Sequence, residues 1–407
     1  MRAHLPRNYV AHVLHGLGGQ TGFRLLMAPT FVPSYLFLLS GSELVVGAAR
    51  ALQSLGQAIS PLLGATLIEH RRRVLPVGFL TGGAMRLQVL LIALAGFLLP
   101  DRPALVAICV CLGLFGFFQG IQGVIFNFLM SKTIPVERRG LLTGMRNALA
   151  GVTVAAVSYG GGRLVESEAL GNGYATTFLV AFGLTAFGLL ALTLVREPEP
   201  PEVRARSNLL GRLADLPALI RADPSFGWYL VARALATTGR MSMPFYVLYA
   251  ATRLDIGGYE LGLLTVLFSL CQSSVNFLWG LIADRHGCRA VFLCALVVWI
   301  ASVLALIGAS GFWVVALCFA GVGAGLGGFM LASLNMVLEF GDRTDLPLQI
   351  AAANASSELM GALGLLLGGV LATQLSLASV LVTGVVLKAA AMAVLVGGVR
   401  EPRSLSA

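Results

Sequence analysis

Residues 280–289 read Gly280-Leu281-Ile282-Ala283-Asp284-Arg285-His286-Gly287-Cys288-Arg289, a charged stretch between two long apolar runs. The runs span 259–282 and 288–308. Each is long enough to cross the membrane as a helix, because a bilayer core about 30 Å thick needs about 20 apolar residues. The stretch therefore predicts a short polar turn between two membrane-spanning helices.

The rest of the chain repeats this pattern of long apolar runs and short polar gaps. Of its 407 residues, 57% are hydrophobic and 12% are charged, whereas a soluble domain carries about 25% charged residues. This composition argues against a water-soluble enzyme and, despite a net charge of +9, against a nucleic-acid partner. We expect an all-α integral membrane protein, in contact with membrane lipid, with twelve transmembrane helices. Their approximate spans are 10–39, 44–68, 74–99, 103–130, 141–163, 174–195, 225–251, 259–282, 288–308, 311–338, 348–372 and 376–399.

Basic residues predict the orientation of the chain, because Lys and Arg accumulate in cytoplasmic loops. If both termini are cytoplasmic, 18 of the 28 basic residues lie in cytoplasmic segments or at the adjoining ends of runs, three in external loops or at the adjoining ends, and seven deeper inside the apolar runs. We therefore expect a multi-pass protein of the cytoplasmic (inner) membrane with both termini in the cytoplasm.

The sequence also contains an internal repeat. A shift of 216 residues places Arg24 on Arg240 and Arg73 on Arg289, and the longest gap lies half-way along the chain. Such repeats occur in secondary transporters, where the binding site lies near the midplane between the two halves. The predicted domains are an N-terminal six-helix bundle (1–195), a cytoplasmic linker (196–224) and a C-terminal six-helix bundle (225–407).

The stretch 280–289 resembles the signature loop of the major facilitator superfamily, Gly-x-x-x-Asp-Arg-x-Gly-x-Arg, at all of its fixed positions. In physical terms, Gly280 would allow close helix packing, and Asp284 would accept hydrogen bonds from the start of a neighbouring helix. The resemblance covers the whole chain without identifying a subfamily. It implies a secondary transporter whose two halves rock between inward-open and outward-open states. The residues of this conformational motif are Gly280, Asp284, Arg285, Gly287 and Arg289.

Two elements depart from the superfamily's pattern. Residues 116–123 resemble its Arg-x-x-Gln-Gly element, but Gly116 stands in the arginine position. The fifth apolar run lacks the proline of the drug-antiporter element. Both departures count against an ordinary proton-driven drug exporter.

Arg24 and Arg240 are the main candidates for a binding site, because ionisable residues inside a membrane are costly and mark function. Both lie near mid-depth of their runs and are followed by a proline, Pro29 or Pro244. Proline at mid-membrane frees a carbonyl and permits bending, and two guanidinium groups from runs one and seven would hold a carboxylate or phosphate. This resembles the arrangement in organophosphate:phosphate antiporters. The alternative is structural ion pairing or hydrogen bonding to carbonyls.

Other cations in the runs have simpler interpretations. Arg50, Arg146 and Arg233 lie within a few turns of a helix end, so we expect their side chains to reach the membrane interface. Arg86 and Lys388 lie in mid-run on helices that are peripheral in the superfamily, so we expect them to stabilise the fold.

Glu358 is the one acid that lies away from the ends of the runs. It is a candidate carrier of a coupling proton, and the alternative is a counter-ion for Arg240 or Lys388. His12 and His15 lie near the start of run one with no carboxylate beside them, so we expect interfacial histidines and no metal site. The remaining predicted substrate-binding residues are Tyr35, Gln119, Gln122, Tyr246 and Asn335. For Gln119, Gln122 and Asn335 the alternative is hydrogen bonding between helices.

These patterns predict a secondary active transporter that moves a small organic solute by alternating access. The solute is expected to be anionic or amphipathic, with protons as the candidate coupling ion. The sequence has no P-loop and no nucleophile-and-base set, so we expect no ATP-driven step, no catalytic residues and no cofactor. We expect a monomer. The alternatives are an efflux pump for hydrophobic compounds and a non-transporting relative that senses a ligand or assembles membrane complexes.

Overall fold

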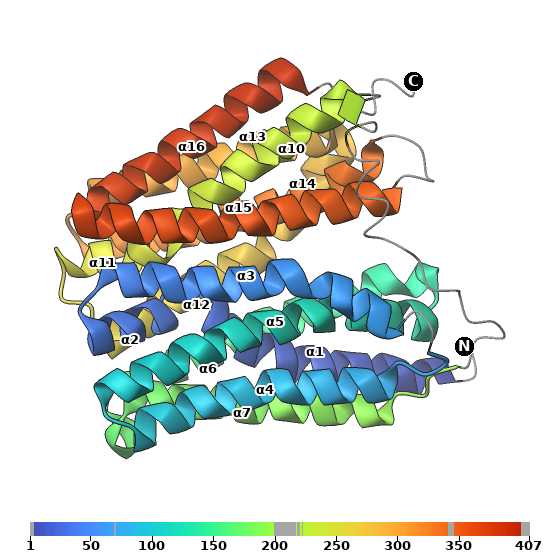
Figure 1. Cartoon of the computed structure of the whole chain (residues 1–407), viewed down its shortest axis with the longest axis horizontal. Coiled ribbons are helices and arrows are strands. Elements are labelled where there is room, and N and C mark those ends of the chain that lie inside the picture. The colour runs from blue at the N-terminus through green and yellow to red at the C-terminus, as the bar shows by residue number, and fades with distance from the viewer. Residues whose placement is uncertain are drawn as a thin grey trace. The chain divides into compact units, whose positions relative to one another are not determined.

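The computed structural model describes residues 4–68, 71–198, 217, 220–221, 223–340 and 346–399. These residues form helices and no strand (Figure 1). Their contacts divide the chain into two compact units. The first unit comprises Met1–Gly41, Leu52–Ser207 and Gly257–Val266, and the second comprises Ser42–Ala51, Asn208–Ile256 and Leu267–Ala407.

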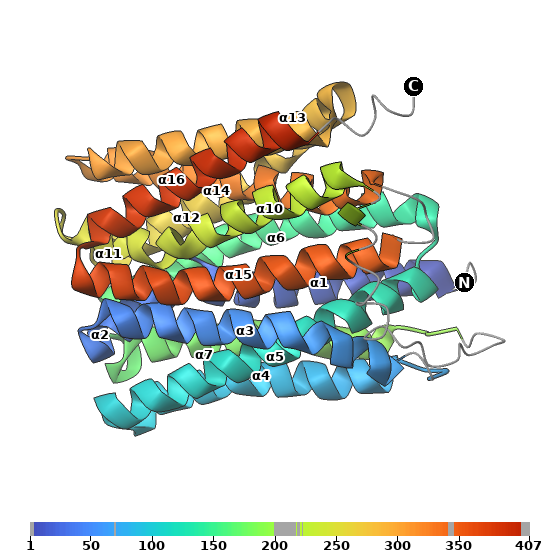
Figure 2. The same cartoon turned by 45° about the horizontal axis from the view of Figure 1, so that its top comes forward.

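The first unit is built around long helices that pack side by side (Figures 1 and 2). Its helices are α1 (Leu5–Met27), α2 (Phe31–Ser40), α3 (Glu43–Ile68) from Leu52 onward, α4 (Leu75–Leu98), α5 (Asp101–Thr133), α6 (Val136–Glu166) and α7 (Gly173–Ala191). Helix α1 packs against α6 and α7, and α4 packs against α5 and α7. Ile121, Ile125 and Leu129 lie about one turn apart on α5 and form part of a buried apolar cluster, as helical periodicity requires.

The second unit has the same helical character. Its elements are the first turns of α3, α10 (Pro224–Thr238), a 3-10 helix (Gly239–Phe245), α11 (Tyr246–Ala251), α12 (Gly258–Ser274) from Leu267 onward, α13 (Asn276–Ile307), α14 (Phe312–Met336), α15 (Leu346–Gln374) and α16 (Leu377–Gly398). Helix α10 packs against α15 and α16, and α13 packs against α14.

Two helices begin in one unit and end in the other. The first turns of α3 belong to the second unit, where a Cβ atom on Gly47 would lie 2.7 Å from the carbonyl oxygen of Leu365 and 2.8 Å from Cα of Gly369. The first turns of α12 belong to the first unit, where a Cβ atom on Gly162 would lie 2.8 Å from Cα of Gly262. Glycine allows the helix backbones to approach closely at both places. The predicted domain bounds, 1–195 and 225–407, remain a prediction, and most of the linker 196–224 lies outside the described residues.

Polar side chains set the starts of several helices. Asn172 accepts a hydrogen bond from the backbone N–H of Ala175 at the start of α7, and Ser376 does the same for Ser379 at the start of α16. Asp223 accepts from the second and third residues of α10. Such caps satisfy backbone donors that have no partner within the helix.

Eight helical segments among the described residues are long and apolar enough to cross a membrane, or up to nine if the bent pair α1–α2 is one span. One of them, 258–307, is broken at Gly287, where φ is 83°. The break lies between the predicted runs 259–282 and 288–308. The all-helical membrane architecture is confirmed, whereas the number of twelve spans and the cytoplasmic location of the termini stay predictions.

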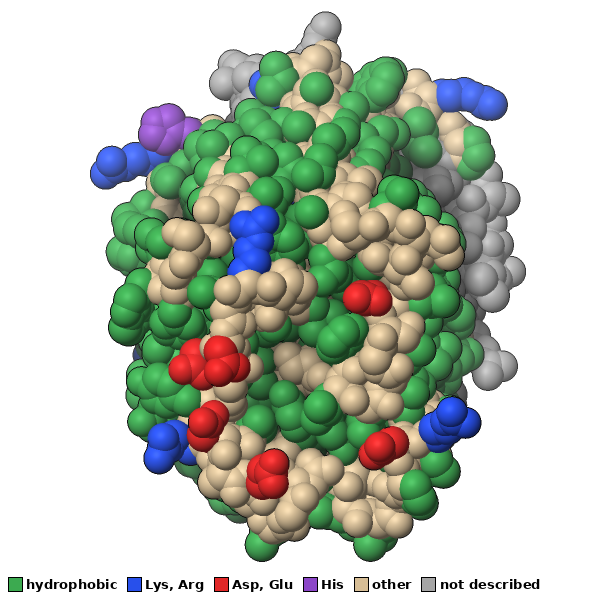
Figure 3. Space-filling model, turned by 90° about the vertical axis from the view of Figure 1, so that its left-hand side faces the viewer, with side chains coloured by type: hydrophobic (Ala, Val, Ile, Leu, Met, Phe, Trp, Pro, Cys, Tyr) green, Lys and Arg blue, Asp and Glu red, His purple; other side chains and the backbone are tan. Residues whose placement is uncertain are grey.

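Acidic residues gather at one loop end of the first unit. Asp101 begins α5, Glu166 ends α6 and Glu168 lies in the following loop. Figure 3 looks at this end and shows acidic side chains among hydrophobic ones. The sequence assigns these loops to the external side, where few basic residues are expected.

Candidate functional site

Arg24 lies where the first apolar run is interrupted. Helix α1 ends at Met27, α2 begins at Phe31, and the two helices are bent by 42°. The Arg24 side chain is partly buried in the last turn of α1, where the helix dipole favours a cation. Pro29 lies in the break, as the sequence predicts.

Arg240 lies where the seventh apolar run is interrupted. Helix α10 ends at Thr238, a 3-10 helix runs from Gly239 to Phe245, and α11 begins at Tyr246. The Arg240 side chain is partly buried, and within the described residues it makes no hydrogen bond. Arg24 belongs to the first unit and Arg240 to the second, so the repeat places one arginine beside a broken helix in each unit.

Lys388 supports the break in the second unit from α16. Its side chain is fully buried, and its ammonium group donates to the carbonyl oxygens of Gly239 (2.6 Å) and Gly384 (3.3 Å). The ammonium also lies 4.6 Å from the ring centroid of Trp299. Gly239 closes α10, so Lys388 caps the end of that helix. The fold-stabilising role expected for this lysine fits the geometry.

Substituting Lys388 with methionine should therefore destabilise the second unit. Hydrogen bonds to charged groups contribute about 1.5–3 kcal/mol, so we expect the apparent Tm of the purified protein to fall by roughly 5 °C. Thermal unfolding in detergent measures this. Arg163→Met is the control, because Arg163 is exposed at the end of α6 and its loss should leave Tm unchanged. An unchanged or higher Tm for Lys388→Met would show that the cost of burying the ammonium exceeds its contacts.

Arg86 has a comparable role in the first unit. Its side chain is 3% exposed, and it donates from Nε to the carbonyl of Thr185 on α7 and from Nη1 to the carbonyl of Gly82 on α4. The guanidinium carbon lies 5.1 Å from the ring centroid of Phe23 on α1. Arg86 thus joins three helices, as expected for a residue that stabilises the fold.

The two tyrosines of the predicted site lie inside their units. Tyr35 is 2% exposed, stacks on Tyr174 at 4.9 Å and accepts a hydrogen bond from Asn172 (3.0 Å). Tyr246 is fully buried and is bonded through its hydroxyl to Ser242 and Trp299. Both hydroxyls already have protein partners, so the structure gives no support to the prediction that they contact substrate.

The predicted polar residues of runs four and ten differ in their surroundings. Gln122 donates to the carbonyl of Gly78 at 2.5 Å, which is the helix-to-helix bond that competes with a binding role. Gln119 has a fully enclosed side-chain oxygen that receives no hydrogen bond from any described residue. Asn335 is exposed in the last turn of α14. Of the three, Gln119 has the unmet hydrogen-bonding capacity that a ligand donor would satisfy.

The prediction that three arginine side chains reach the membrane interface is wrong for Arg50, Arg146 and Arg233. They are only 7%, 5% and 7% exposed. Arg233 donates to the hydroxyl of Tyr229 and to the side-chain oxygen of Asn354. Their distance from a helix end permits snorkelling, but their side chains point into the protein.

His12 corrects the expectation of interfacial histidines in the same way. It is fully buried, and its Nε2 atom lies 2.9 Å from the hydroxyl of Thr133.

Of the two glycines in the loop motif, the structure requires glycine at 287 but not at 280. Gly287 has φ 83° and ψ 165°, a conformation that is essentially restricted to glycine. A Cβ atom on Gly280 would meet no atom within 4 Å, so the close packing expected there is absent among the described residues. Arg289 donates to the carbonyl of Val396 at 3.0 Å and ties α13 to α16. Asp284 and Arg285 are exposed, and no hydrogen bond to Asp284 occurs in the described parts of the chain.

Glu358 is partly buried on α15. It forms no ion pair or hydrogen bond in the part of the chain that the structure describes, and Lys388 is bonded to carbonyls instead. The alternative of a counter-ion to Lys388 or Arg240 is therefore not supported there.

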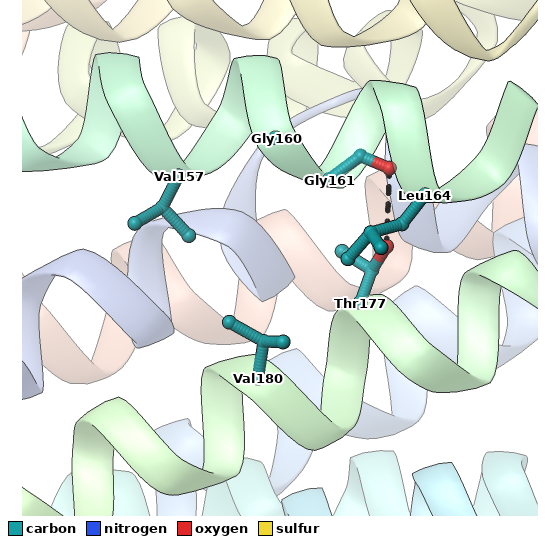
Figure 4. A pocket seen from close by; sticks show the side chains of 6 residues that line it. All are labelled: Val157, Gly160, Gly161, Leu164, Thr177 and Val180. Carbon is teal, nitrogen blue, oxygen red and sulfur yellow. Dashed lines mark hydrogen bonds between the residues drawn. The ribbon is translucent and has the colours of Figure 1, made fainter. Parts of the chain in front are cut away.

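Two apolar pockets lie between helices of the first unit. One, of about 250 Å³, lies between α6 and α7 and is shown in Figure 4, where Thr177 donates to the carbonyl of Gly161 at 3.2 Å. The other, of about 530 Å³, is lined by α4 and α5. Neither pocket includes a predicted substrate-binding residue, and their apolar linings suit lipid chains better than a polar solute.

Comparisons with known proteins bear on the whole chain. A family model described as Major Facilitator Superfamily matches twice, at residues 16–247 and 229–406. A crystal structure of a D-xylose-proton symporter has a TM-score of 0.73 at 14% identity, covering 98% of this chain and 99% of that one. The xylose transporter XylE from E. coli, partially occluded and inward open, gives 0.73 at 13% identity, with coverage of 98% and 99%. A mutant of the nucleoside transporter NupG gives 0.69 at 12% identity, with coverage of 95% and 97%.

At these identities the solved structures show the shared fold alone, and no curated protein matches the chain. The double match of one family model agrees with the internal repeat. The helical architecture, the signature loop with its glycine turn and the family match lead to one conclusion. The chain belongs to the Major Facilitator Superfamily and is a membrane transporter, not an enzyme.

Proposed function

We propose that the chain is a secondary active transporter that moves a small organic anion across the cytoplasmic membrane by alternating access. The observation that carries this proposal is the placement of Arg24 and Arg240 at interruptions of the first and seventh apolar runs. Interrupted helices at corresponding positions of two repeats point to the binding site of a transporter. In this proposal the chain has twelve spans, cytoplasmic termini and six-helix bundles at 1–195 and 225–407.

Arginine suits the proposed ligand for geometric reasons. Its planar guanidinium presents paired N–H donors that match the two oxygens of a carboxylate or phosphate. The end of α1 and the 3-10 helix after α10 leave these side chains only partly buried. Gln119, with its unpartnered oxygen, and the exposed Asn335 are proposed to contact polar groups elsewhere on the solute.

The structural relatives support a small organic solute. They are a D-xylose-proton symporter and a nucleoside transporter, and xylose and nucleosides are small polar molecules. Away from the ends of the apolar runs there are seven basic residues and one acid, and this surplus favours an anion over these neutral solutes in the present chain.

Uptake into liposomes tests the proposal. The purified chain is reconstituted, and the uptake of labelled small carboxylates and phosphate esters is compared with that of xylose and a nucleoside. We expect saturable uptake of at least one anion above protein-free liposomes. If the chain takes up only neutral solutes, the proposed anionic substrate is rejected, whereas the proposed transport function stands.

Glu358 is proposed to carry the coupling proton. Glu358→Gln removes the titratable group and keeps its size, so we expect it to abolish uptake driven by a pH gradient. Exchange of internal for external solute, which needs no net proton movement, should continue at a rate close to that of the unmodified chain. Gln349 lies on the same helix, so Gln349→Glu adds a carboxyl elsewhere on that helix. As a control, adding Gln349→Glu to Glu358→Gln should not restore proton coupling. Unchanged pH-driven uptake in Glu358→Gln would contradict this role.

A further inference from the structure

The first unit contains a second group of cationic and aromatic side chains, separate from Arg24. Phe126 on α5 lies at its centre. The ring of His15 on α1 stacks on Phe126 with a centroid distance of 5.1 Å and an interplanar angle of 21°. The guanidinium carbon of Arg146 on α6 lies 4.5 Å from the centroid of the same ring. Three helices thus bring an arginine, a histidine and a phenylalanine together.

Arg146 is buried without an anionic partner. Its side chain is 5% exposed, and its Nε atom is enclosed with no hydrogen-bond acceptor. Within the described residues its guanidinium forms no hydrogen bond and no ion pair. Among the described residues, the face of Phe126 is the one contact that stabilises this charge, although a buried cation ordinarily has a partner.

The neighbouring histidines also have unmet hydrogen-bonding capacity. In the part of the chain that the structure describes, the enclosed Nδ1 atoms of His12 and His15 have no hydrogen-bond partner. His12 is fixed through Nε2 by the hydroxyl of Thr133 at 2.9 Å, whereas His15 has no hydrogen bond within the described residues. Unpaired buried polar atoms of this kind are uncommon in folded proteins and call for an explanation.

Two glycines of α1 make room for these cations. A Cβ atom on Gly16 would lie 3.0 Å from Cγ and 3.2 Å from Cβ of Arg146. A Cβ atom on Gly19 would lie 3.7 Å from Nη2 of Arg86 and 3.9 Å from Nε2 of His15. The backbone of α1 therefore leaves space for two guanidinium groups and an imidazole, and no carboxylate of the described residues pairs with either arginine.

We propose that Arg146 and His15, on the ring of Phe126, form a subsite for a small organic carboxylate. Arg146 provides the charge and paired donors that match a carboxylate, and His15 provides an N–H donor. One unbonded cation matches one negative charge, which favours a monocarboxylate over a phosphate. The rings of Phe126 and His15 offer an apolar surface for the attached group. This subsite is separate from the proposed Arg24 and Arg240 site, and its ligand binds whether or not transport follows.

Equilibrium binding to the full chain tests the subsite. Radiolabelled benzoate is titrated onto purified protein in lipid nanodiscs at constant ionic strength, with inorganic phosphate as the competing oxyanion. We expect saturable benzoate binding that phosphate does not displace. Arg146→Gln should raise Kd at least tenfold, and Arg146→Lys, which keeps the charge and loses the planar fork, should raise it less.

Arg233→Gln is the matched control, because Arg233 is equally buried but already bonded to Tyr229 and Asn354. This variant should bind benzoate within twofold of the unmodified chain. Absence of saturable binding, displacement by phosphate, or unchanged Kd in Arg146→Gln would each overturn the subsite. Loss of binding in Arg24→Gln alone would assign the benzoate to the proposed transport site. Binding without any transport would leave the subsite standing and reject the proposed function.

Discussion

Replacing Gly116 with leucine is expected to prevent the first unit from folding normally. A Cβ atom at this position of α5 would overlap the carbonyl oxygen of Gln53 on α3 and would lie 2.8 Å from its carbonyl carbon and 3.1 Å from its Cα. All three atoms are backbone, so no side chain can move aside. Overpacking in a tight core costs about 1–3 kcal/mol and sometimes more, and we expect the upper end of that range. The readout is the yield of monodisperse protein and its apparent Tm.

Gly123→Leu on the same helix is the control. A Cβ atom there would meet no atom within 4 Å, so Gly123→Leu should fold with an unchanged or higher Tm, since glycine is a poor helix former. Equal behaviour of the two variants would mean that α3 and α5 do not pack as the structure describes.

The same contact explains a departure from the superfamily's pattern. Gly116 stands where the Arg-x-x-Gln-Gly element has an arginine, and the approach of the α3 backbone leaves no space for any side chain there. Gly116→Arg should therefore disrupt folding as Gly116→Leu does. A close helix contact occupies the position of that arginine in this chain.

Arg24→Gln is expected to lower anion uptake strongly. Glutamine removes the charge and the paired donors while keeping a polar side chain of moderate size. Loss of a charged hydrogen-bonded contact costs about 3 kcal/mol, which corresponds to roughly a hundredfold weaker binding. The same loss is expected for Arg240→Gln. The measurement is the concentration dependence of labelled-anion uptake by liposomes.

Arg24→Lys separates the effect of the charge from that of the planar guanidinium, and Arg163→Gln is the control at an exposed arginine. Lysine keeps the charge but not the planar fork, so Arg24→Lys should retain part of the uptake, and the exposed Arg163 should be replaceable without effect. If either Arg24→Gln or Arg240→Gln keeps the affinity of the unmodified chain for every transported anion, the two arginines do not hold the substrate together.

The sequence predicts the architecture well where a local physical rule decides it. The turn at Gly287 follows from a backbone conformation that other residues avoid. The helix breaks beside Arg24 and Arg240 follow from Pro29 and Pro244, which interrupt hydrogen bonding within a helix. Caps and apolar runs likewise depend on neighbours in sequence, and the structure has helices in all these runs.

Side-chain direction within the bundle is not available from sequence in the same way. Depth along a run suggested interfacial positions for Arg50, Arg146 and Arg233, but each side chain is buried, because depth says nothing about which way a residue faces around the helix. The position of Tyr35 in its run likewise does not reveal that its ring stacks on Tyr174. The group of His15, Phe126 and Arg146 combines three helices, and the glycines at 16 and 19 are the only signal in the sequence that hints at it.

Counterflow into liposomes tests directly whether the chain transports organic anions. Vesicles containing the purified chain are loaded with an unlabelled organic anion, diluted into the labelled anion and followed in time without any applied pH gradient or ATP. We expect transient accumulation of label above equilibrium, absent from protein-free vesicles and strongly reduced in Arg24→Gln. Absence of counterflow for every carboxylate and phosphate ester, in protein that unfolds cooperatively on heating, would contradict a transporter of organic anions.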